Sequence, residues 1–295
     1  MRTTPVCVIA ATDCAALSLV ARTHADAAHI GRLAADALTA ELDAWPKPGL
    51  VSPRDSGSHD DMDYATFQRS IVALRPFYAD LASAGATNAP MDELRRIGRL
   101  AEDAMLVATG GVNTHRGAIF ALGLLCAGAG AAVAEGRPPS ADQLTRIVSE
   151  RWARDIVRGP IPLNSHGSGA LRRFGAGGAR AEAAAGFPHA RTIGLPALRV
   201  GRTLADEEAA RVHAFFALLA HMEDTNLLHR GGAEGLDDAR REAREFLLAG
   251  GVGQAAWLDH ALAVHRRFVA RRLSPGGSAD LLAVTIFLDA IERQP

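Results

Sequence analysis

Gly110-Gly111-Val112-Asn113-Thr114-His115-Arg116-Gly117-Ala118-Ile119-Phe120 joins the end of one amphipathic helix to the start of an apolar one. The two glycines break the first helix. A run of four hydrogen-bonding or charged side chains, Asn113 to Arg116, then precedes the second, and a hydrophobic core does not need such a run. The start of a helix offers free backbone N–H groups and the positive end of the helix dipole, and both favour an anion. The segment therefore predicts a phosphate-rich ligand at the N-terminus of the second helix.

The rest of the chain is predicted to be helical almost throughout. Apolar residues recur at helical spacing, for example at Ile30, Leu33 and Ala37, and no stretch alternates as a half-buried strand does. Helices are expected at residues 25–45, 64–83, 92–109, 117–134, 140–157, 205–224, 235–249, 254–271 and 279–292. The fold class expected is all-α. Residues 24–295 form a single globular multi-helix domain, with a Gly-rich irregular segment in the middle (159–201, with a short helix at 179–185), and residues 1–23 form an N-terminal extension.

The composition limits the classes of function. Hydrophobic residues make up 48% of the 295-residue chain, which is enough for a sizeable core. The formal net charge of -1 gives no basic field to hold nucleic acid. The three cysteines, Cys7, Cys14 and Cys126, are too scattered for a disulfide framework or a zinc site, and they fit a reducing cytoplasm. Asp13 interrupts the mildly apolar N-terminus, so no signal peptide is expected.

Residues 117–134 are uncharged and about as long as a membrane span. Glycines and many alanines make this segment only weakly hydrophobic, and it directly follows the polar run Asn113 to Arg116. We therefore expect a buried central helix and no membrane partner.

Six polar segments lie where helices are predicted to begin or end. They span residues 46–51, 57–63, 110–120, 164–167 with 175–182 and 186–188, 223–226 with 229–232, and 273–283. The first is also typical of a simple helix stop and turn. In the second, Asp60, Asp61 and Asp63 directly precede a predicted helix, where carboxylates bind Mg²⁺, act as acid and base, or cap the helix.

The later segments also have two explanations each. Glu223 and Asp224 stand at the end of a predicted helix, where the helix dipole disfavours them and a bound cation would remove that cost. Ser278 is expected to cap the last helix, and both capping and metal binding explain Asp280 in its first turn. Arg180 and its neighbours stand among small residues that allow a ligand to approach the backbone closely, although a flexible loop has the same composition.

Standard nucleotide-binding and hydrolase motifs are absent. The sequence has no Gly-x-x-x-x-Gly-Lys-Ser/Thr phosphate loop and no Gly-x-Gly-x-x-Gly after a strand. It also has no His-Glu-x-x-His and no Gly-x-Ser-x-Gly. Any nucleotide site must therefore be built differently.

Taken in order, the polar segments resemble those of the triphosphoribosyl-dephospho-CoA synthase family. The match covers roughly residues 30 to 290 and is carried by residues 46–51, 57–62, 110–120, 166–167, 178–188 and 273–283. Arg116 stands where the family pattern has lysine, which keeps the charge but changes the donor geometry. Ser52-Pro53 replaces an acidic–basic pair. The pattern is closer to the malonate decarboxylase branch of the family than to the citrate lyase branch.

The resemblance implies a transferase that joins ATP to 3′-dephospho-CoA and releases adenine. The product, 2′-(5″-triphosphoribosyl)-3′-dephospho-CoA, is the prosthetic-group precursor of an acyl carrier subunit and passes to a carrier-protein holo-transferase. Glycosyl transfer needs one group to protonate the leaving base and another to accept a proton from the attacking hydroxyl. The triphosphate needs neutralisation, so Mg²⁺ is expected beside the substrate ATP. A cytoplasmic enzyme is expected, and a homo-oligomer is compatible with the sequence.

The resemblance and the residue chemistry together assign roles to the polar segments. The residues assigned to catalysis are Asp60, Asp61, Glu102 and His59. Those assigned to substrate and phosphate binding are Lys47, Asn113, Thr114, His115, Arg116, His166, Arg180, Glu182, Ser274, Gly276 and Gly277. Those assigned to metal binding are Asp61, Glu102, Glu223, Asp224 and Asp280. Our hypothesis is that a carboxylate of the Asp60–Asp61 pair deprotonates the 2′-hydroxyl.

Two other classes of function stay open at this point. The His59-Asp60 pair is also found in metal-dependent helical hydrolases of phosphoesters, and a helical hydrolase of ADP-ribose-type N-glycosidic bonds would use similar carboxylates. A non-catalytic helical factor that docks a carrier subunit is the third possibility. The transferase hypothesis expects Asp61, His115, Arg180 and Asp280 to converge in one cleft, and their placement on unrelated faces with no shared cavity would rule it out.

Overall fold

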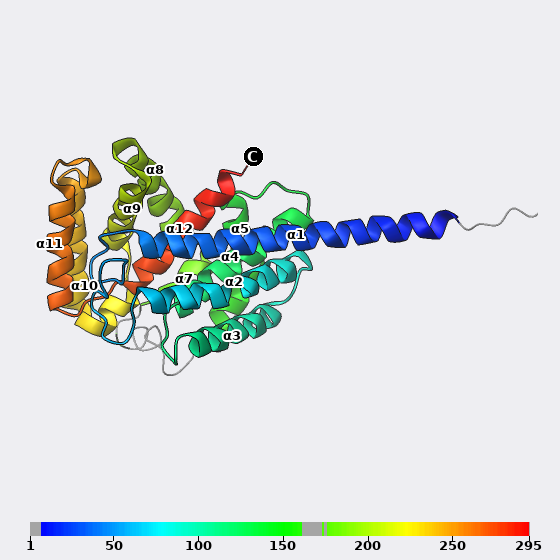
Figure 1. Cartoon of the computed structure of the whole chain (residues 1–295), viewed down its shortest axis with the longest axis horizontal. Coiled ribbons are helices and arrows are strands. Elements are labelled where there is room, and N and C mark those ends of the chain that lie inside the picture. Colours follow the sequence, from blue (N-terminus) through cyan, green and yellow to red (C-terminus); the bar gives the residue numbers. More distant parts are fainter. Residues whose placement is uncertain (1–6, 161–172, 174–175, 295) are drawn as a thin grey trace, which may run out of the picture.

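The structure is a computed structural model that describes residues 7–160, 173 and 176–294, with side chains from residue 25 onward. Every regular element in these ranges is helical (Figure 1). The helices are α1 (Cys7–Asp43), α2 (Tyr64–Ala86), α3 (Met91–Ala108), α4 (Arg116–Ala134), α5 (Ala141–Arg158), α7 (Gly178–Ala184), α8 (Leu195–Leu204), α9 (Glu207–His221), α10 (Thr225–Leu248), α11 (Trp257–Ala270) and α12 (Gly276–Glu292), with a π-helical turn η1 (Ala190–Gly194) and a 3₁₀ turn η2 (Gly251–Gly253). The expected all-α fold is confirmed.

The apolar helix α4 lies at the centre of one group of helices. It contacts α1, α2, α3, α5 and α12. By length and composition alone it would also suit a membrane span, but 78% of it is buried inside the protein. The expected buried central helix is therefore confirmed.

Glycines allow α2 and α4 to approach each other closely. A Cβ atom on Gly130 of α4 would lie 1.9 Å from the carbonyl oxygen of Ala82, and one on Gly85 of α2 would lie 1.9 Å from that of Ala127. No side chain fits at either position while the helices keep this spacing. The small residues that weaken the hydrophobicity of α4 thus determine its packing.

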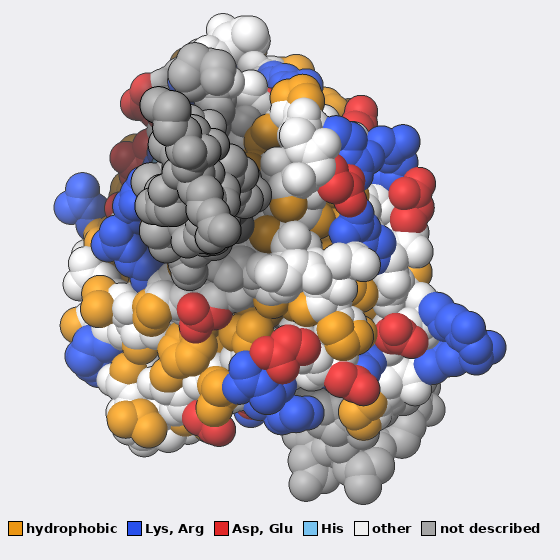
Figure 2. Space-filling view, turned by 90° about the vertical axis from the view of Figure 1, so that its right-hand side faces the viewer, with side chains coloured by type: hydrophobic (Ala, Val, Ile, Leu, Met, Phe, Trp, Pro, Cys, Tyr) orange, Lys and Arg blue, Asp and Glu red, His pale blue; other side chains and the backbone are white. Residues whose placement is uncertain are grey.

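α12 connects two groups of helices. The first group is α1 to α5, and the second is α8 to α11; α12 packs on α1 and α4 and also on α9 and α10. The loop after α1 lies beside α10, at the end of the molecule away from the start of α1 (Figure 1). Figure 2 views the molecule from the opposite end, where acidic and basic side chains are interspersed with hydrophobic ones.

Some boundaries differ from those predicted. α1 begins at Cys7 and not at residue 25, because the Ala-rich sequence from residue 7 to 24 has high helix propensity and contains no glycine or proline. η1 and most of α8 lie in the segment expected to be irregular. α10 begins ten residues before its predicted start, with a break at Gly232 (φ 64°). α12 begins at Gly276, so Ser278 lies inside the helix and does not cap it.

Gly130→Ala tests the close contact between α2 and α4. The added methyl group must push the helices apart, so we expect the free energy of unfolding to fall by about 1–3 kcal/mol. Gly98→Ala on α3 is the matched control, since no atom of the described residues lies within 4 Å of its added methyl group, and helix propensity predicts up to about 1 kcal/mol of stabilisation. Urea denaturation measures both; stabilisation of both variants would contradict the packing.

Candidate active site

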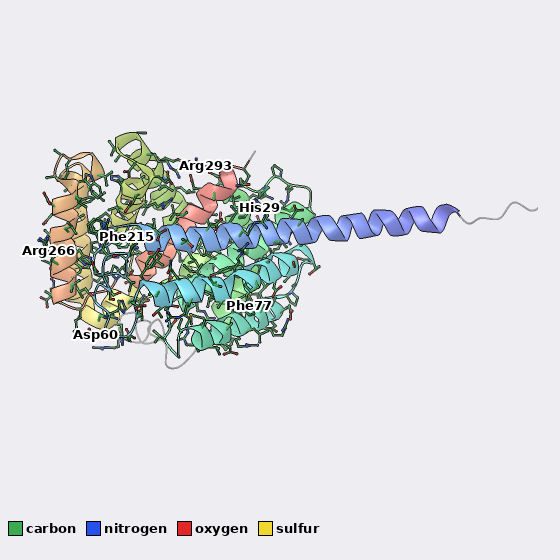
Figure 3. The ribbon with its side chains drawn as sticks, in the orientation of Figure 1. His29, Asp60, Phe77, Phe215, Arg266 and Arg293 are labelled. Atoms are coloured by element: carbon green, nitrogen blue, oxygen red, sulfur yellow. The ribbon has the colours of Figure 1, made fainter. Side chains whose placement is uncertain are left out.

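A cavity of about 400 Å³ lies where the loop between α1 and α2 meets the N-termini of α4, α10 and α12. This volume suits a small-molecule ligand. Figure 3 labels Asp60 at this end of the molecule. The predicted site residues that line the cavity are His59, Asp61, Asn113, Thr114, His115, Arg116, Ser274, Gly276 and Asp280.

Three helices begin at the wall of this cavity. Gly117 of α4, Asn226 of α10 and Gly276 of α12 lie in the first turns of their helices and line it. The starts of α4 and α12, and of the short first segment of α10 before its break at Gly232, thus face one space, although Asp224, Asp280 and Asn113 already accept hydrogen bonds from several of their first-turn N–H groups. The start of α4, where the sequence predicted an anion, is one part of this larger arrangement.

The loop between α1 and α2 folds back on the segment before α12. Ser58 Oγ donates a hydrogen bond to the carbonyl oxygen of Leu273 (2.6 Å), and Ser58 N–H donates to that of Gly49 (3.0 Å). Gly49 has a φ of 72°, and a Cβ there would lie 2.1 Å from the Leu273 carbonyl oxygen. Only glycine fits this conformation and this spacing. Three of the six polar segments therefore meet here.

Lys47 is completely buried and caps the C-terminus of α1. Its Nζ donates to the carbonyl oxygens of Glu41 (2.6 Å), Leu42 (3.2 Å) and Ala44 (2.9 Å), and it lies 3.4 Å from Glu41 Oε1. Burial lowers the pKa of Lys47, and the Glu41 carboxylate opposes that shift. The ammonium group is occupied within the protein and does not line the cavity, so the predicted phosphate contact does not fit Lys47.

Two carboxylates reach the cavity from α12 and α1. Asp280 lies against the start of α4, where it accepts a hydrogen bond from Ala118 N–H. Burial, and after it the negative charges of Glu41 and Asp224, raise the pKa of Asp280 well above its usual range. Burial also raises the pKa of Glu41. Sequence reasoning missed Glu41, because a glutamate in an amphipathic helix looks like an ordinary solvated residue.

Asp224 is a buried bridge between α10 and α12. Its Oδ1 accepts from the N–H groups of Asn226 (2.9 Å) and Leu227 (3.3 Å), and its Oδ2 accepts from Ser278 N–H (2.8 Å) and Oγ–H (3.0 Å). With both oxygens occupied, Asp224 is corrected from a metal ligand to a structural residue. Glu223 beside it is exposed and does not line the cavity.

His59 is held in one orientation on the cavity wall. Arg230 Nη2 donates to its Nδ1 (3.3 Å), so the ring proton lies on Nε2, which donates to Ser274 Oγ (2.8 Å). Asp61 Oδ1 lies 3.7 Å from Nδ1. Burial and then Arg230 lower the pKa of His59, and Asp61 opposes this shift. The imidazole is therefore neutral near pH 7.

Asp60 and Asp61 have different surroundings. Asp61 lines the cavity. Asp60 forms an ion pair with Arg272 (2.7 Å), and both side chains are largely exposed. Such a surface pair contributes little to stability. Only Asp61 of the two is placed to meet a ligand in the cavity.

His115 is buried at the start of α4. Its Nδ1 lies 2.7 Å from Ser70 Oγ, which accepts a hydrogen bond from Thr114 Oγ1 (2.8 Å). The ring of Phe67 packs edge-on against it, with 4.9 Å between ring centres. Burial lowers the pKa of His115 to about 3. A neutral ring has no charge to offer a phosphate.

Arg116 is the cation at the start of α4. Its guanidinium pairs with Glu102 of α3, and its backbone N–H donates to Asn113 Oδ1 (3.1 Å). Glu102 itself does not line the cavity. Its position fits a group that orients Arg116, not one that contacts substrate.

Arg180 and Glu182 do not line the cavity. Arg180 caps the C-terminus of α5 by donating to the carbonyl oxygens of Ile156 (2.9 Å) and Gly159 (2.8 Å). Glu182 accepts hydrogen bonds from the N–H (2.9 Å) and the ring (2.7 Å) of His189. The expectation that Arg180 joins Asp61, His115 and Asp280 is wrong, because helix-end carbonyls bind its guanidinium.

No group of three His, Cys, Asp or Glu side chains is placed to hold a metal ion, within the residues that the structure describes. Asp61 and Asp280 are the predicted metal ligands that line the cavity. Gly277 packs against Asp224, with 3.2 Å between its notional Cβ and Oδ2. His166 lies outside the described residues.

The sequence model of a family described as ATP:dephospho-CoA triphosphoribosyl transferase matches residues 27–295. The chain belongs to this family. A probable 2-(5″-triphosphoribosyl)-3′-dephosphocoenzyme-A synthase of Acinetobacter calcoaceticus is 38% identical, over 89% of this chain and 90% of its own. The synthase of that name in Klebsiella pneumoniae is 40% identical, over 86% of this chain and 88% of its own. No solved structure matches the chain.

Membership of this family makes the protein a transferase, a triphosphoribosyl-dephospho-CoA synthase. The resemblance seen in the polar segments is thereby confirmed. The comparisons support neither the hydrolase nor the non-catalytic docking factor.

The depressed pKa of His115 predicts how stability depends on pH. The unfolded chain takes up a proton at this histidine below about pH 6.5, whereas the folded protein does so only near pH 3. Stability from this group is therefore lost as the pH falls through that window. Between pH 7 and pH 5 the loss is about 2 kcal/mol. Urea denaturation of wild type and His115→Gln at both pH values measures it; an equal loss in both proteins would contradict the burial of a neutral ring.

Proposed function

We propose that this cavity is where the triphosphoribosyl group of ATP passes to the ribose 2′-hydroxyl of 3′-dephospho-CoA with release of adenine. The observation that carries the proposal is the convergence of three helix N-termini, with Arg116 and Arg230, on a cavity that also contains carboxylates. Helix starts and arginine bind phosphates without cleaving them. The carboxylates are suited to the glycosyl transfer.

In this reaction the bond between ribose C1′ and adenine N9 breaks, and a bond from C1′ to the 2′-oxygen of dephospho-CoA forms. The hydroxyl loses one proton and adenine gains one, so the protons balance. Positive charge develops on the ribose in an oxocarbenium-like transition state, and nearby carboxylates stabilise it. The phosphate chain stays intact, so the groups around it need only bind and orient it.

We assign the removal of the hydroxyl proton to Asp61. It is the member of the Asp60–Asp61 pair that lines the cavity, and it is largely exposed to it or to solvent, so an approaching hydroxyl has access. His59, held by Arg230 and Ser274, fixes the wall beside it. Arg116, oriented by Glu102, is assigned to the triphosphate.

Asp280 is the residue best suited to Mg²⁺. Proteins bind this ion through one or two carboxylates, with substrate phosphates as further ligands. Burial, and after it the carboxylates of Glu41 and Asp224, raise the pKa of Asp280, and a bound cation would favour its ionised form. Mg²⁺ would neutralise the triphosphate there, and the absence of an all-protein ligand cage among the described residues agrees with an ion that enters with ATP.

We further propose that the product serves malonate decarboxylase and not citrate lyase. The polar segments of the sequence, which are closer to that branch of the family, support this assignment. Expression in a bacterium that lacks its own synthase should restore growth on malonate; restoration on citrate alone would reverse the assignment. The holo-transferase partner, the cytoplasmic location and a homo-oligomer stay predictions from the sequence.

Mass spectrometry tests the activity directly. Incubation of the protein with ATP, Mg²⁺ and dephospho-CoA should yield free adenine and the joined product in equal amounts. Leaving out dephospho-CoA should abolish adenine release. Adenine or inorganic phosphate formed at the same rate without dephospho-CoA would instead show a hydrolase.

Asp61→Asn and Asp60→Asn form a matched pair of variants. Removal of a general base should lower kcat of Asp61→Asn by about 10²–10⁴-fold. The same change at the exposed neighbouring Asp60 should leave kcat within about threefold, since a surface ion pair contributes little. Adenine release measures both; similar losses in the two variants would remove Asp61 from its assigned role.

A further inference from the structure

The lining of the cavity is divided by chemistry. The starts of α4, α10 and α12 contribute mainly charged and polar groups. Besides Glu41, His59 and Asp61, the segment from α1 to α2 contributes the apolar residues Leu38, Leu42, Leu50, Val51, Met62 and Phe67. The apolar part suits the faces of a heteroaromatic base, and the charged part suits a polyphosphate. Adenine is the leaving group of the proposed reaction, so contacts in the apolar part affect the rate.

His115 adjoins the apolar part through its contact with Phe67. It lines the cavity although only 3% of its surface is exposed. Its Nδ1 is engaged by Ser70, but its Nε2 is buried and has no hydrogen-bond partner among the residues that the structure describes. A buried polar nitrogen without a partner is costly, and because the His115 side chain borders the cavity, a ligand that packs against it would supply the missing partner.

Two hydroxyl groups set the tautomer of this ring. Thr114 Oγ1 donates to Ser70 Oγ. With that hydrogen bond accepted, the hydroxyl proton of Ser70 is free to donate to His115 Nδ1, 2.7 Å away. Nδ1 is then an acceptor, and the single proton of the neutral ring lies on Nε2. Nε2–H is therefore a hydrogen-bond donor that lacks an acceptor among the described residues.

We propose that His115 Nε2–H donates a hydrogen bond to a ring nitrogen of the leaving adenine, with Ser70 and Thr114 as positioning residues that fix its tautomer. The proton stays on Nε2, and the bond stabilises the electron density that adenine gains as its bond to C1′ breaks. Adenine then takes its proton from solvent, to which Asp61 returns the proton of the 2′-hydroxyl. This inference rests on the proposed function and adds to it the group that recognises the base.

A phosphate partner for Nε2 is less suitable. The low pKa of His115 leaves its ring uncharged at neutral pH, and the ring packs on Phe67. Arg116 and Arg230, which also line the cavity, are charged and suit a phosphate better. A neutral N–H donor beside an aromatic ring matches a purine nitrogen, which is an acceptor within a flat apolar surface.

The test compares three nucleotides: ATP, 7-deaza-ATP and 3-deaza-ATP, in which a CH group replaces N7 or N3 of the base. Adenine or deazaadenine release is measured for wild type and for His115→Phe, which keeps an aromatic ring but removes the donor. With ATP the variant should lose about 100-fold in kcat. With the analogue that lacks the accepting nitrogen, the two proteins should differ by less than about threefold, as expected when the missing interaction is the same one.

An equal loss in the variant with all three nucleotides would overturn the proposal. Calorimetry with Mg²⁺ and inorganic triphosphate supplies the second criterion: His115→Phe should bind this probe within about threefold of wild type, because the removed donor serves the base. A tenfold loss would assign His115 to the phosphates. If wild type releases no adenine from ATP and dephospho-CoA, the proposed function fails first, which is a distinct outcome.

Two further measurements do not depend on the folding of His115→Phe. The ¹⁵N spectrum of wild-type His115 should show a protonated Nε2 and an unprotonated Nδ1; the reverse tautomer would contradict the proposal. Ser70→Ala should lower kcat with little change in KM for ATP, and Ser70→Thr should recover activity by restoring the hydroxyl. Unchanged kcat in Ser70→Ala would remove Ser70 from its positioning role.

Discussion

The buried carboxylate of Asp224 is the contact on which the site depends most. It accepts hydrogen bonds from the first turn of α10 and from Ser278 in α12, and so holds two helix N-termini side by side. Asp280, bonded to Ala118 N–H, adds the start of α4. The positive ends of three helix dipoles repel one another when brought together. Hydrogen bonds from these helix starts to the two aspartates hold them together, and Gly117, Asn226 and Gly276 of the three starts line the cavity.

In the proposed function, this arrangement lets one cavity bind both a highly charged phosphate chain and a neutral base. Arg116 forms an ion pair with Glu102, and Asp280 accepts a hydrogen bond from the start of α4. The two imidazoles, His59 and His115, are kept neutral by burial, so they serve as oriented hydrogen-bonding groups and not as cations. Positive potential therefore comes mainly from backbone N–H groups and arginine, which bind a triphosphate but do not attack it.

Much of the fold and part of the site could be predicted from the sequence. The apolar periodicity gave the helices, and the run Asn113 to Arg116 lies at the cavity. The sequence could not show which carbonyl groups a long cationic side chain would reach. Lys47 and Arg180 were expected at phosphates, but both cap helix C-termini, where the orphan carbonyl groups are a local and equally good partner. Glu41 went unnoticed, because only the fold places it in the cavity wall.

The central claim is that three helix starts together form the polyphosphate site. A crystal structure of the protein soaked with inorganic triphosphate and Mg²⁺ tests it most directly. We expect density for the triphosphate within hydrogen-bond distance of backbone N–H groups at the starts of α4, α10 and α12, with Arg116 in contact. The opposite result would be triphosphate bound only elsewhere, for example beside Arg146 and Arg191, with water in the cavity between α4, α10 and α12. That result would contradict a polyphosphate site at the three helix starts.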